Sequence, residues 1–363
     1  MDATFERRQL ADAPAADRAT TRLCPEYREV VDRTVELLRA TKARLRTALP
    51  QGAGVEAAST IQAITRDLWN DWRVAWAEAA DCLSEIAGSA EHMRLAKDYT
   101  ESHLTPELMG APVWRQAYAK PLGYPGDYVV MNFMYDRAPA GDTPFGKVAH
   151  ELAVQIGQFV VKRKDLVRQA ISDVAARTTG TRPCVVASLG CGPALEVAEY
   201  LQLESHGERP MHFVLIDQDS EALRFAGRQL GAVAATGDRG SAPQIELRHL
   251  SVLRLLREID PASLLPPADM IYSAGLFDYF SDRTCHVLTR RLYDALRPGG
   301  LLLLGNMKSG TDMLWPLELI ADWSLHYRSA ASVLSWTDAL PGAEISLRTE
   351  ATGYDYLVSV RKG

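Results

Sequence analysis

The sequence predicts an α/β fold with a doubly wound, mostly parallel sheet, preceded by a helical region. Three observations support this prediction. The mostly apolar run Cys184–Ser188 has the length of a buried strand, and it breaks into a turn containing Gly190 and Gly192 before helical spacing begins. A second apolar run, Phe213–Ile216, ends in Asp217. Before residue 110, apolar residues recur at three- and four-residue spacing, as in amphipathic helices.

The turn between the first strand and its helix has the features of a cofactor-binding loop. Glycine at 190 and 192 permits positive φ or close approach of a ligand to the backbone, and Pro193 suits the first turn of a helix. Asp217 follows about 27 residues after Gly190, at the tip of the second strand, where doubly wound folds bind a ribose diol. The dinucleotide fingerprint GxGxxG is incomplete. The alternative is an ordinary strand–turn–helix with a surface aspartate.

Composition excludes several classes of function. The chain has 363 residues, of which 47% are hydrophobic and 24% charged, as in globular proteins. A net charge of -6 provides no basic field for nucleic acid or anionic lipid. We find no apolar run long enough for a membrane span and no signal-peptide core at the N-terminus. The 5 cysteines are scattered without CxxC spacing, which indicates reduced thiols in the cytoplasm, and we infer no metal site.

The chain divides into three expected parts. Residues 1–22 are a polar, alanine-rich leader; residues 23–143 form a helical cap; and residues 144–363 form the core. In the cap, Trp69, Trp72 and Trp76 indicate either a cofactor stack or, as we favour, a helix face in a core. Residues 120–135 are dense in glycine, proline and aromatic residues, which predicts either a connector between cap and core or, as we favour mainly from a family resemblance given below, an active-site loop.

The core is expected to alternate helices and strands and to end in a hairpin, which gives a seven-stranded sheet with one reversed strand. Its expected later elements are, in order, a helix over Phe145–Ala176, a helix over Ser220–Leu230, strands over Ile245–Leu250 and Ala268–Ser273, a helix over Arg283–Leu296, a strand over Leu301–Leu304, and hairpin strands over Ile345–Thr349 and Tyr354–Val360. Arg297-Pro298-Gly299-Gly300 is expected to stop the last of these helices.

Two short blocks resemble a known superfamily. The pair GCGPA (190–194) and LIDQD (215–219) resembles the glycine loop and acidic loop of class I S-adenosylmethionine-dependent methyltransferases, which have a Rossmann-like seven-stranded core. The tip of the third strand departs from that pattern, because Ser251 stands where an acid often binds adenine. The resemblance implies S-adenosyl-L-methionine as cofactor, bound by Tyr124, Asp127, Leu189, Gly190, Gly192, Asp217, Gln218, Ser251, Ser273 and Gly275.

Three longer blocks resemble a narrower family. They are KPLGYPGDYVVMNFMY (120–135), YSAGLFDYFSDRT (272–284) and GNMKSGTDMLWPLELIADWSLHYRS (305–329), and they are similar to bacterial proteins known as 3-hydroxypalmitic acid methyl ester biosynthesis proteins. The resemblance covers roughly residues 105–360. It implies a helical N-terminal region before a methyltransferase core, and methyl transfer to a fatty-acyl carboxyl group.

The expected acceptor site is rich in aromatic and acidic residues. A carboxylate acceptor needs a donor or cation to position it, whereas an amine or a carbon acceptor needs a group that takes its proton. Arg328 would clamp a carboxylate or form a surface ion pair, and Glu318 and Asp322, four apart, would share a helix face as a proton-accepting pair or a solvated edge. The expected catalytic residues are Tyr279, Glu318 and His326, and the expected substrate-binding residues are Tyr128, Asn132, Tyr135, Asp278, Asn306, Trp323, Tyr327 and Arg328.

We therefore expect a cytoplasmic methyltransferase of specialised metabolism that acts on a small, partly apolar metabolite. O-methylation of a carboxylate is the first hypothesis. N- or C-methylation, with Glu318 or Tyr279 accepting the proton, is the second, and a regulator that binds S-adenosylmethionine without catalysis is the third. We expect no nucleic-acid substrate, because SAGLF (273–277) stands in place of an Asn/Asp-Pro-Pro-aromatic motif, and no membrane partner. Protein methylation and the oligomeric state, including a homodimer, stay open.

Overall fold

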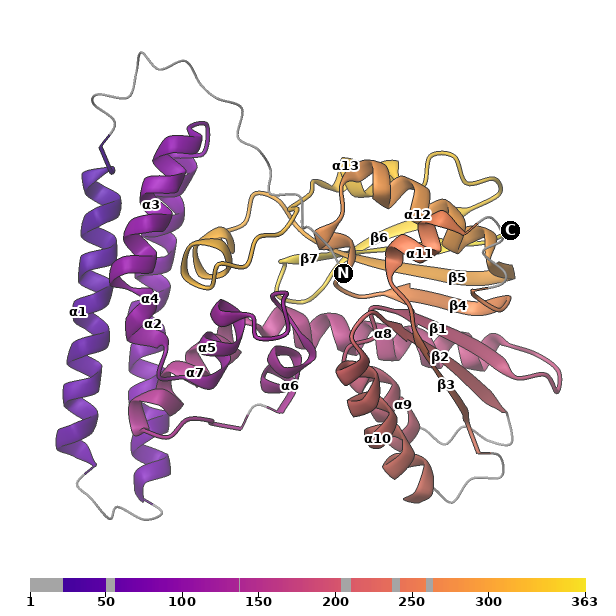
Figure 1. Ribbon diagram of the computed structural model, residues 1–363, viewed down its shortest axis with the longest axis horizontal. Helices are drawn as coiled ribbons and strands as arrows, with labels where there is room; N and C mark the ends of the chain where they lie inside the picture. The colour runs from indigo at the N-terminus through magenta and orange to yellow at the C-terminus, as the bar shows by residue number, and fades with distance from the viewer. Residues whose placement is uncertain (1–21, 50–55, 137, 204–209, 237–241, 259–263) are drawn as a thin grey trace.

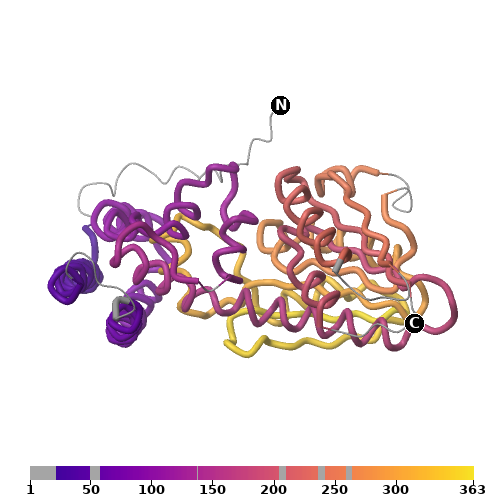
Figure 2. The backbone as a smooth tube through the Cα atoms, turned by 90° about the horizontal axis from the view of Figure 1, so that it is seen from below, coloured from indigo at the N-terminus to yellow at the C-terminus, as the bar shows by residue number. Residues whose placement is uncertain are grey.

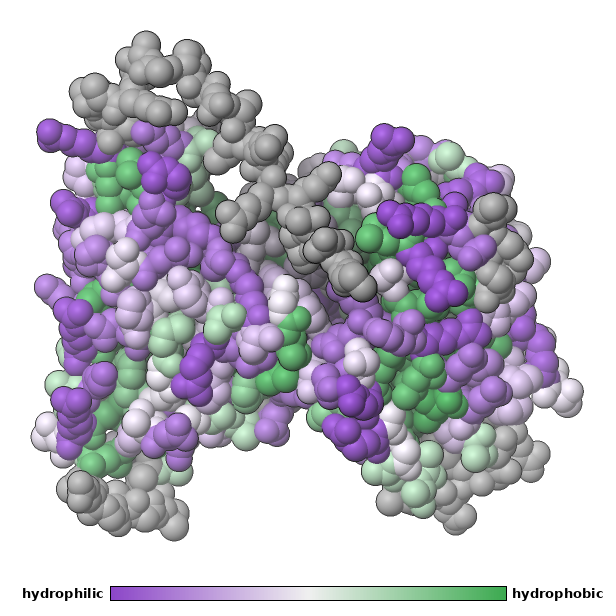
Figure 3. Space-filling model, viewed as in Figure 1, coloured by the Kyte–Doolittle hydropathy of each residue, from purple (hydrophilic) through white to green (hydrophobic). Residues whose placement is uncertain are grey.

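The computed structural model describes residues 22–49, 56–136, 138–203, 210–236, 242–258 and 264–363. A helical region and a sheet region lie side by side (Figure 1). Hydrophilic residues are spread over both regions in the view of Figure 3, with apolar residues in small patches between them. None of the described helices is long and apolar enough to cross a membrane. The expected leader, residues 1–22, lies almost entirely outside the described residues.

The sheet has seven strands in the order β3-β2-β1-β4-β5-β7-β6. Strands β1 to β5 are parallel, and β7 runs antiparallel to both β5 and β6. This arrangement confirms the predicted seven-stranded sheet with one reversed strand. The strands are β1 (Cys184–Leu189), β2 (Met211–Asp217), β3 (Gln244–His249), β4 (Ala268–Ser273), β5 (Leu296–Met307), β6 (Glu344–Thr349) and β7 (Asp355–Arg361).

Helices cover both faces of the sheet. Because side chains alternate along a strand, Cys184 and Val186 of β1 pack on one face and Val185 and Ala187 on the other. The first face is covered by α8 (Gln158–Arg177), α9 (Leu195–Leu203) and α10 (Ser220–Thr236). The second is covered by α11 (Val252–Arg257), α12 (Asp282–Asp294) and α13 (Ala330–Ser335). Helix α8 also runs from the helical region along the sheet (Figure 2).

The helical region packs around a core rich in tryptophan. Trp72 is 0% exposed and Trp76 is 5% exposed, so the tryptophan pattern of this helix is a core face, as the sequence indicated. The region comprises α1 (Pro25–Ala48), α2 (Glu56–Ile86), α3 (Ala90–His103), α4 (Thr105–Leu108), α5 (Pro112–Ala119), α6 (Tyr128–Asp136) and α7 (Pro144–Ile156).

The segment that follows β5, residues 308–329, is inserted into this helical core. Trp315, on the short π-helix η4 (Trp315–Ile320), is 0% exposed, and its ring centroid lies 5.1 Å from that of Trp72. The Trp76 indole Nε1 donates to the carbonyl of Asp312 at 2.7 Å, and the Thr105 hydroxyl donates to the carbonyl of Ile320 at 2.9 Å. Part of the sheet-region chain therefore belongs, by packing, to the helical region.

The expected boundary at residue 144 does not match this packing. Helix α7 and the first turn of α8, including Phe159 and Val160, lie in the same apolar cluster as Trp72 and Trp315. Val167, further along α8, packs against the sheet instead. The two regions therefore meet within α8, because an apolar helix face continues across the expected boundary.

Three expected elements differ in extent from the structure. The expected single helix over Phe145–Ala176 is two helices, α7 and α8, which meet at Gly157. Met134 packs against Gly157 so closely that an added Cβ would lie 3.1 Å from its Cε. Residues 128–135 of the expected active-site loop belong to α6 (Tyr128–Asp136). The glycine pair expected to stop a helix before the fifth strand lies inside β5, because Gly299 N donates to the carbonyl of Lys362 at 2.7 Å and Lys362 N donates to that of Gly300 at 2.9 Å.

We expect Trp315→Ala to lower the free energy of unfolding by about 3–5 kcal/mol, since it empties the contact between the two regions. Urea unfolding followed by circular dichroism measures this loss. Leu253→Ala is the control, because Leu253 is 56% exposed, and its effect should stay within about 0.5 kcal/mol. Equal effects of the two variants would contradict the packing described.

Candidate cofactor and acceptor site

The glycine loop between β1 and α9 has the geometry expected of a binding loop. Gly190 has φ of 67° and Gly192 has φ of 50°, both in the left-handed region that favours glycine. A Cβ on Gly190 would lie 3.2 Å from the side chain of Leu276, whereas one on Gly192 would meet nothing within 4 Å. The backbone at Gly192 is therefore open to a ligand.

Asp217, the last residue of β2, is bonded to this loop. One carboxylate oxygen accepts from Gly192 N at 2.9 Å, and the other accepts from Asp219 N at 2.9 Å. Burial raises the pKa of Asp217, and these backbone N–H groups oppose the shift. Gln218, the next residue, accepts a 2.9 Å bond at its carbonyl from the His249 ring. The carboxylate has about four lone-pair sites, so the backbone donors leave room for a bond from a ligand hydroxyl.

The loop lies where the strand order of the sheet reverses. From β1, the chain proceeds outward through β2 and β3, and then returns to β4 on the other side of β1. In open α/β sheets, ligands bind beyond the carboxyl ends of the strands at this switch point. The Ser273 hydroxyl, 0% exposed, donates to the carbonyl of Leu189 at 2.9 Å and so joins the ends of β4 and β1. Ser251, the N-cap of α11, makes no side-chain capping bond.

The segment 120–127 reaches from the helical region to this loop. The Tyr124 hydroxyl donates to Asp219 at 2.9 Å, so Tyr124 joins the helical region to the sheet region. Asp127, expected to contact the cofactor, is 1% exposed and caps α6 through bonds from Val129 N and Val130 N. Asp127 also accepts from Gln116, so its carboxylate has a structural role.

Tyr279 and Trp323 meet beneath the segment 120–127. The Trp323 indole Nε1 donates to the Tyr279 hydroxyl at 2.9 Å, and that hydroxyl donates to the carbonyl of Pro125 at 3.1 Å. Gly126 has φ of 67°, and an added Cβ would lie 2.8 Å from Cη2 of Trp323 and 2.9 Å from the Tyr279 hydroxyl. The structure thus brings together three predicted site residues, Tyr124, Tyr279 and Trp323, from distant parts of the chain.

A buried charge cluster that sequence analysis missed lies next to this site. Arg163 of α8 donates to Asp355 at 2.5 Å, and its Nη1 is 3.9 Å from Asp278. A Cβ on Gly275 would lie 2.6 Å from the same guanidinium, so Gly275 makes room for Arg163. The signal available in the sequence was the position of Arg163, which lies within the charged run 162–165 but at helical spacing from the apolar residues Val160 and Val167.

The cluster holds two carboxylates against one guanidinium. Burial, followed by the neighbouring Asp355, raises the pKa of Asp278 to about 8, despite the opposing charge of Arg163. Burial raises the pKa of Asp355 to about 6. Like charges that share a buried site disfavour ionisation of both groups, so the cluster retains a proton at neutral pH.

The guanidinium of Arg328 is bonded to other groups of the protein and is not free to bind a methyl acceptor. Its guanidinium is 5% exposed; Nε donates to Asp282 at 2.6 Å and Nη1 to the Asn306 side chain at 2.6 Å. Further bonds run to the carbonyls of Phe277 and Phe280. Asn306, 0% exposed, also donates to the carbonyl of His326 at 2.9 Å. The expected carboxylate clamp is therefore replaced by a structural hydrogen-bond network, and the His326 side chain is exposed.

Glu318 and Asp322 do not share a helix face, contrary to expectation. Helix η4 ends at Ile320, and Asp322 has φ of 49°, which directs the chain out of the helix. Asp322 forms ion pairs with Lys97 of α3 and Lys120 at the end of α5. Glu318 is half-buried, and burial raises its pKa.

Helix α6 carries three more of the expected acceptor residues. Tyr128 lies with its ring centroid 5.5 Å from that of Phe225, and Asn132 is half-buried. The ammonium of Lys164 lies 6.0 Å from the centre of the Tyr135 ring, and burial raises the pKa of Tyr135. These residues extend along α6 between the helical and sheet regions.

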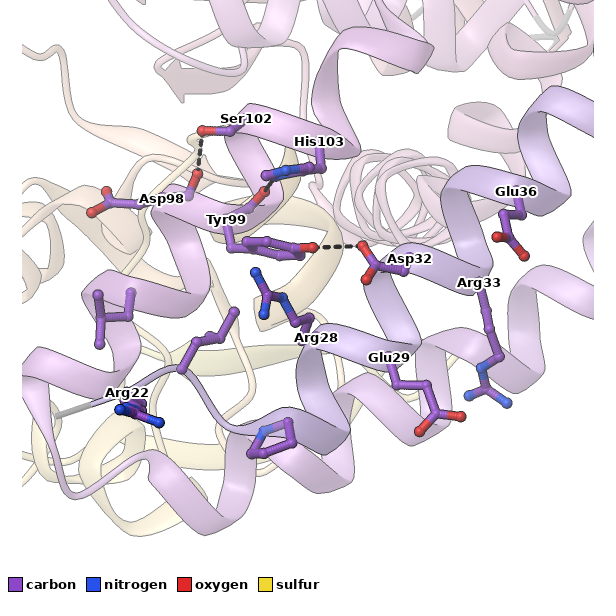
Figure 4. Close-up of a pocket in the computed structure, with 13 residues that line it drawn as sticks. Arg22, Arg28, Glu29, Asp32, Arg33, Glu36, Asp98, Tyr99, Ser102 and His103 are labelled. Carbon is purple, nitrogen blue, oxygen red and sulfur yellow. Dashed lines mark hydrogen bonds between the residues drawn. The ribbon is translucent and has the colours of Figure 1, made fainter. Parts of the chain in front are cut away.

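Two cavities differ in chemistry. One of about 30 Å³ has a wholly apolar lining that includes Trp114, Met134, Gly157, Leu317 and Trp323, and so reaches the acceptor side of the site. Figure 4 shows the other, of about 1110 Å³, which lies between α1 and α3.

The wider pocket is lined by groups that pair with one another. The Arg28 guanidinium lies 5.1 Å from the centre of the Tyr99 ring, and the Tyr99 hydroxyl donates to Asp32 at 2.6 Å. The Tyr99 ring also stacks on His103, with centroids 4.0 Å apart. Within the described ranges, no group of three or more His, Cys, Asp or Glu residues could hold a metal ion.

No family model and no curated protein sequence matches the chain. Among solved structures, a possible exported protein from Bordetella parapertussis has 18% sequence identity and a TM-score of 0.50, covering 94% of this chain and 99% of that one. Magnesium protoporphyrin IX methyltransferase from Synechocystis PCC 6803, with S-adenosylhomocysteine bound, has 12% identity and a TM-score of 0.44, covering 65% and 94%. The N-methyltransferase NodS from Bradyrhizobium japonicum, also with S-adenosylhomocysteine, has 17% identity and a TM-score of 0.37, covering 56% and 86%. The similarity to the Bordetella protein, at 18% identity, is a similarity of fold alone.

The chain has the class I methyltransferase fold. The strand order, with β7 reversed between β5 and β6, is the arrangement that the resemblance implied. Which residues bind cofactor and acceptor stays a prediction.

We expect Gly126→Ala to destabilise the protein more than Gly123→Ala. Both residues have positive φ, 67° and 88°, so both variants carry the same kind of backbone strain. Only the Cβ at 126 would collide with Trp323 and Tyr279, while the one at 123 would meet nothing within 4 Å. The difference in unfolding free energy, from urea titration, should be about 1–3 kcal/mol. Equal losses would show that the contact between segment 120–127 and Trp323 is absent.

The buried cluster predicts a stability that falls as pH rises. A carboxyl whose pKa is raised by folding binds a proton in the folded state that the unfolded state has released, so stability is lost from about pH 4 to about pH 8. Asp278→Asn should flatten this dependence by up to about 1.4 kcal/mol per pH unit. Urea unfolding at pH 5, 6, 7 and 8 measures the slope, and an unchanged slope in the variant would refute the shift assigned to Asp278.

Proposed function

We propose that the protein is an S-adenosyl-L-methionine-dependent methyltransferase that acts on a small, partly apolar metabolite. The observation that carries the proposal is the bond from Gly192 N to Asp217, which holds an open glycine loop and a strand-end carboxylate together at the switch point of the sheet. This is the position where doubly wound folds bind a nucleoside-type ligand.

The chain's own residues suit this cofactor. Asp217 would accept from the ribose hydroxyls, and the exposed backbone at Gly192 would approach the ligand closely. When bound, the cofactor supplies a methyl group on a positively charged sulfur. Tyr124, Tyr279 and Trp323 would line the place where the cofactor meets the acceptor, and their aromatic rings would exclude water from it.

Support for a partly apolar acceptor comes from the aromatic side chains and the small apolar cavity next to Trp323. O-methylation of a carboxylate is an expectation from the resemblance. Because Arg328 is bonded to Asp282 and Asn306, O-methylation would need other donors to position the carboxylate. We also propose a cytoplasmic location, which the free cysteines favour, and a role in specialised metabolism. Turnover distinguishes the enzyme from a regulator that binds the cofactor without catalysis.

Calorimetric titration with S-adenosylhomocysteine tests the cofactor site. Asp217→Ala should weaken binding by about 1–3 kcal/mol, because a buried ligand hydroxyl would lose its acceptor. Asp294→Ala is the matched control, since its side chain is 52% exposed on α12, outside the described site, and its affinity should equal that of the wild type. Absence of binding by the wild type, or equal affinities for all three proteins, would overturn the proposal.

A further inference from the structure

Four cations around the acceptor side of the site, among the residues that the structure describes, are already paired. Arg328 binds Asp282 and Asn306, and Arg163 binds Asp355 and faces Asp278. Lys97 and Lys120 both pair with Asp322. Each of these four cations is therefore committed to an acceptor of the protein itself. A carboxylate that entered here would lose its hydration without gaining a free cation, which is costly.

Glu318, by contrast, has a carboxylate with little internal pairing. It accepts a long bond of 3.4 Å from the backbone N–H of Leu325, and Lys97, the cation that acts on it, is bonded to Asp322. Burial of Glu318 makes it a stronger proton acceptor than an exposed carboxylate. A half-buried acid in this state is suited to hold a cation or take a proton.

Tyr327 provides a second polar atom that lacks a partner. Its hydroxyl is buried and makes no hydrogen bond within the described residues. Burial raises the pKa of this phenol, and so, to a smaller extent, do Glu318 and Asp278, so the hydroxyl lies near both acids. A buried hydroxyl without a partner costs free energy, which a polar atom of a ligand would recover. Tyr279 and Tyr327 both pack against the apolar cluster of the helical region.

We propose that Glu318 and Tyr327 bind the acceptor through an amine nitrogen, so that the proposed methyltransferase is an N-methyltransferase of a small amine with an apolar arm. This inference rests on the proposed function and names the substrate class of the same site. The apolar arm would lie against the aromatic rings of Tyr279 and Trp323, next to the apolar side chains of the helical region.

The chemistry balances with these groups. An amine arrives as an ammonium ion, and the carboxylate of Glu318 takes one proton, which frees the nitrogen lone pair. The lone pair forms the new N–C bond to the methyl group while the C–S bond breaks and its electron pair stays on sulfur. The product is a methylated ammonium ion and S-adenosylhomocysteine, and the proton on Glu318 passes to water. Tyr327 would orient the nitrogen by hydrogen bonding.

Calorimetric titration of the protein saturated with S-adenosylhomocysteine tests this assignment, with octylamine and octanoate as probes of matched chain length. We expect the wild type to bind octylamine at least about tenfold more tightly than octanoate, because only the amine gains a partner charge. Glu318→Gln keeps the shape of the side chain and should abolish the preference while leaving S-adenosylhomocysteine affinity unchanged. Tyr327→Phe should weaken octylamine binding roughly fivefold through one lost hydrogen bond.

Octanoate binding equal to that of octylamine, persistence of the preference in Glu318→Gln, or no binding of either probe would overturn this inference. S-adenosylhomocysteine is titrated first, so these results differ from failure of the proposed function. A wild-type protein that binds no S-adenosylhomocysteine overturns the proposed function and the amine assignment together.

Discussion

The packing of Trp315 against Trp72 is the contact on which the rest of the site depends. It anchors the segment that follows β5 in the helical core, so both regions share one apolar cluster. Glu318, Trp323 and Tyr327 all lie on that segment. Burying a tryptophan stabilises this arrangement by several kcal/mol, which exceeds what the ion pairs of Asp322 at the same junction contribute. The acceptor side of the site is therefore built from the sheet region but positioned by the helical region.

Two chemical environments meet at the carboxyl ends of the strands. On one side, Gly192 N and Asp217 present backbone and carboxylate to a ligand. On the other, the paired guanidinium groups of Arg163 and Arg328 fix the turn after β4 without offering a free charge. Arg163 is held by two carboxylates, which leaves a proton in the buried cluster and little positive charge at the surface of the site. The site thus combines a local excess of acids with aromatic walls.

Features that depend on neighbours in sequence could be predicted. Apolar runs indicated β1, β2 and β4, and the left-handed glycines at 190 and 192 followed from the turn between a strand and a helix. The ends of β5 could not be predicted in the same way, because its pairing with residues near Lys362 depends on the far end of the chain. The same reason hid the bond between Arg163 and Asp355, which lie 192 residues apart. The bonds of Arg328 were hidden for the same reason, because its partners Asp282, Asn306 and Phe277 lie far from it in the sequence.

The structure of the complex with S-adenosylhomocysteine tests the central claim most directly, because it locates both ends of the ligand at once. The account predicts that the ribose hydroxyls lie within hydrogen-bond distance of Asp217 and that the sulfur faces Tyr279 and Trp323, toward the segment that follows β5. A ligand bound elsewhere, or one whose sulfur faces away from that segment, would contradict it.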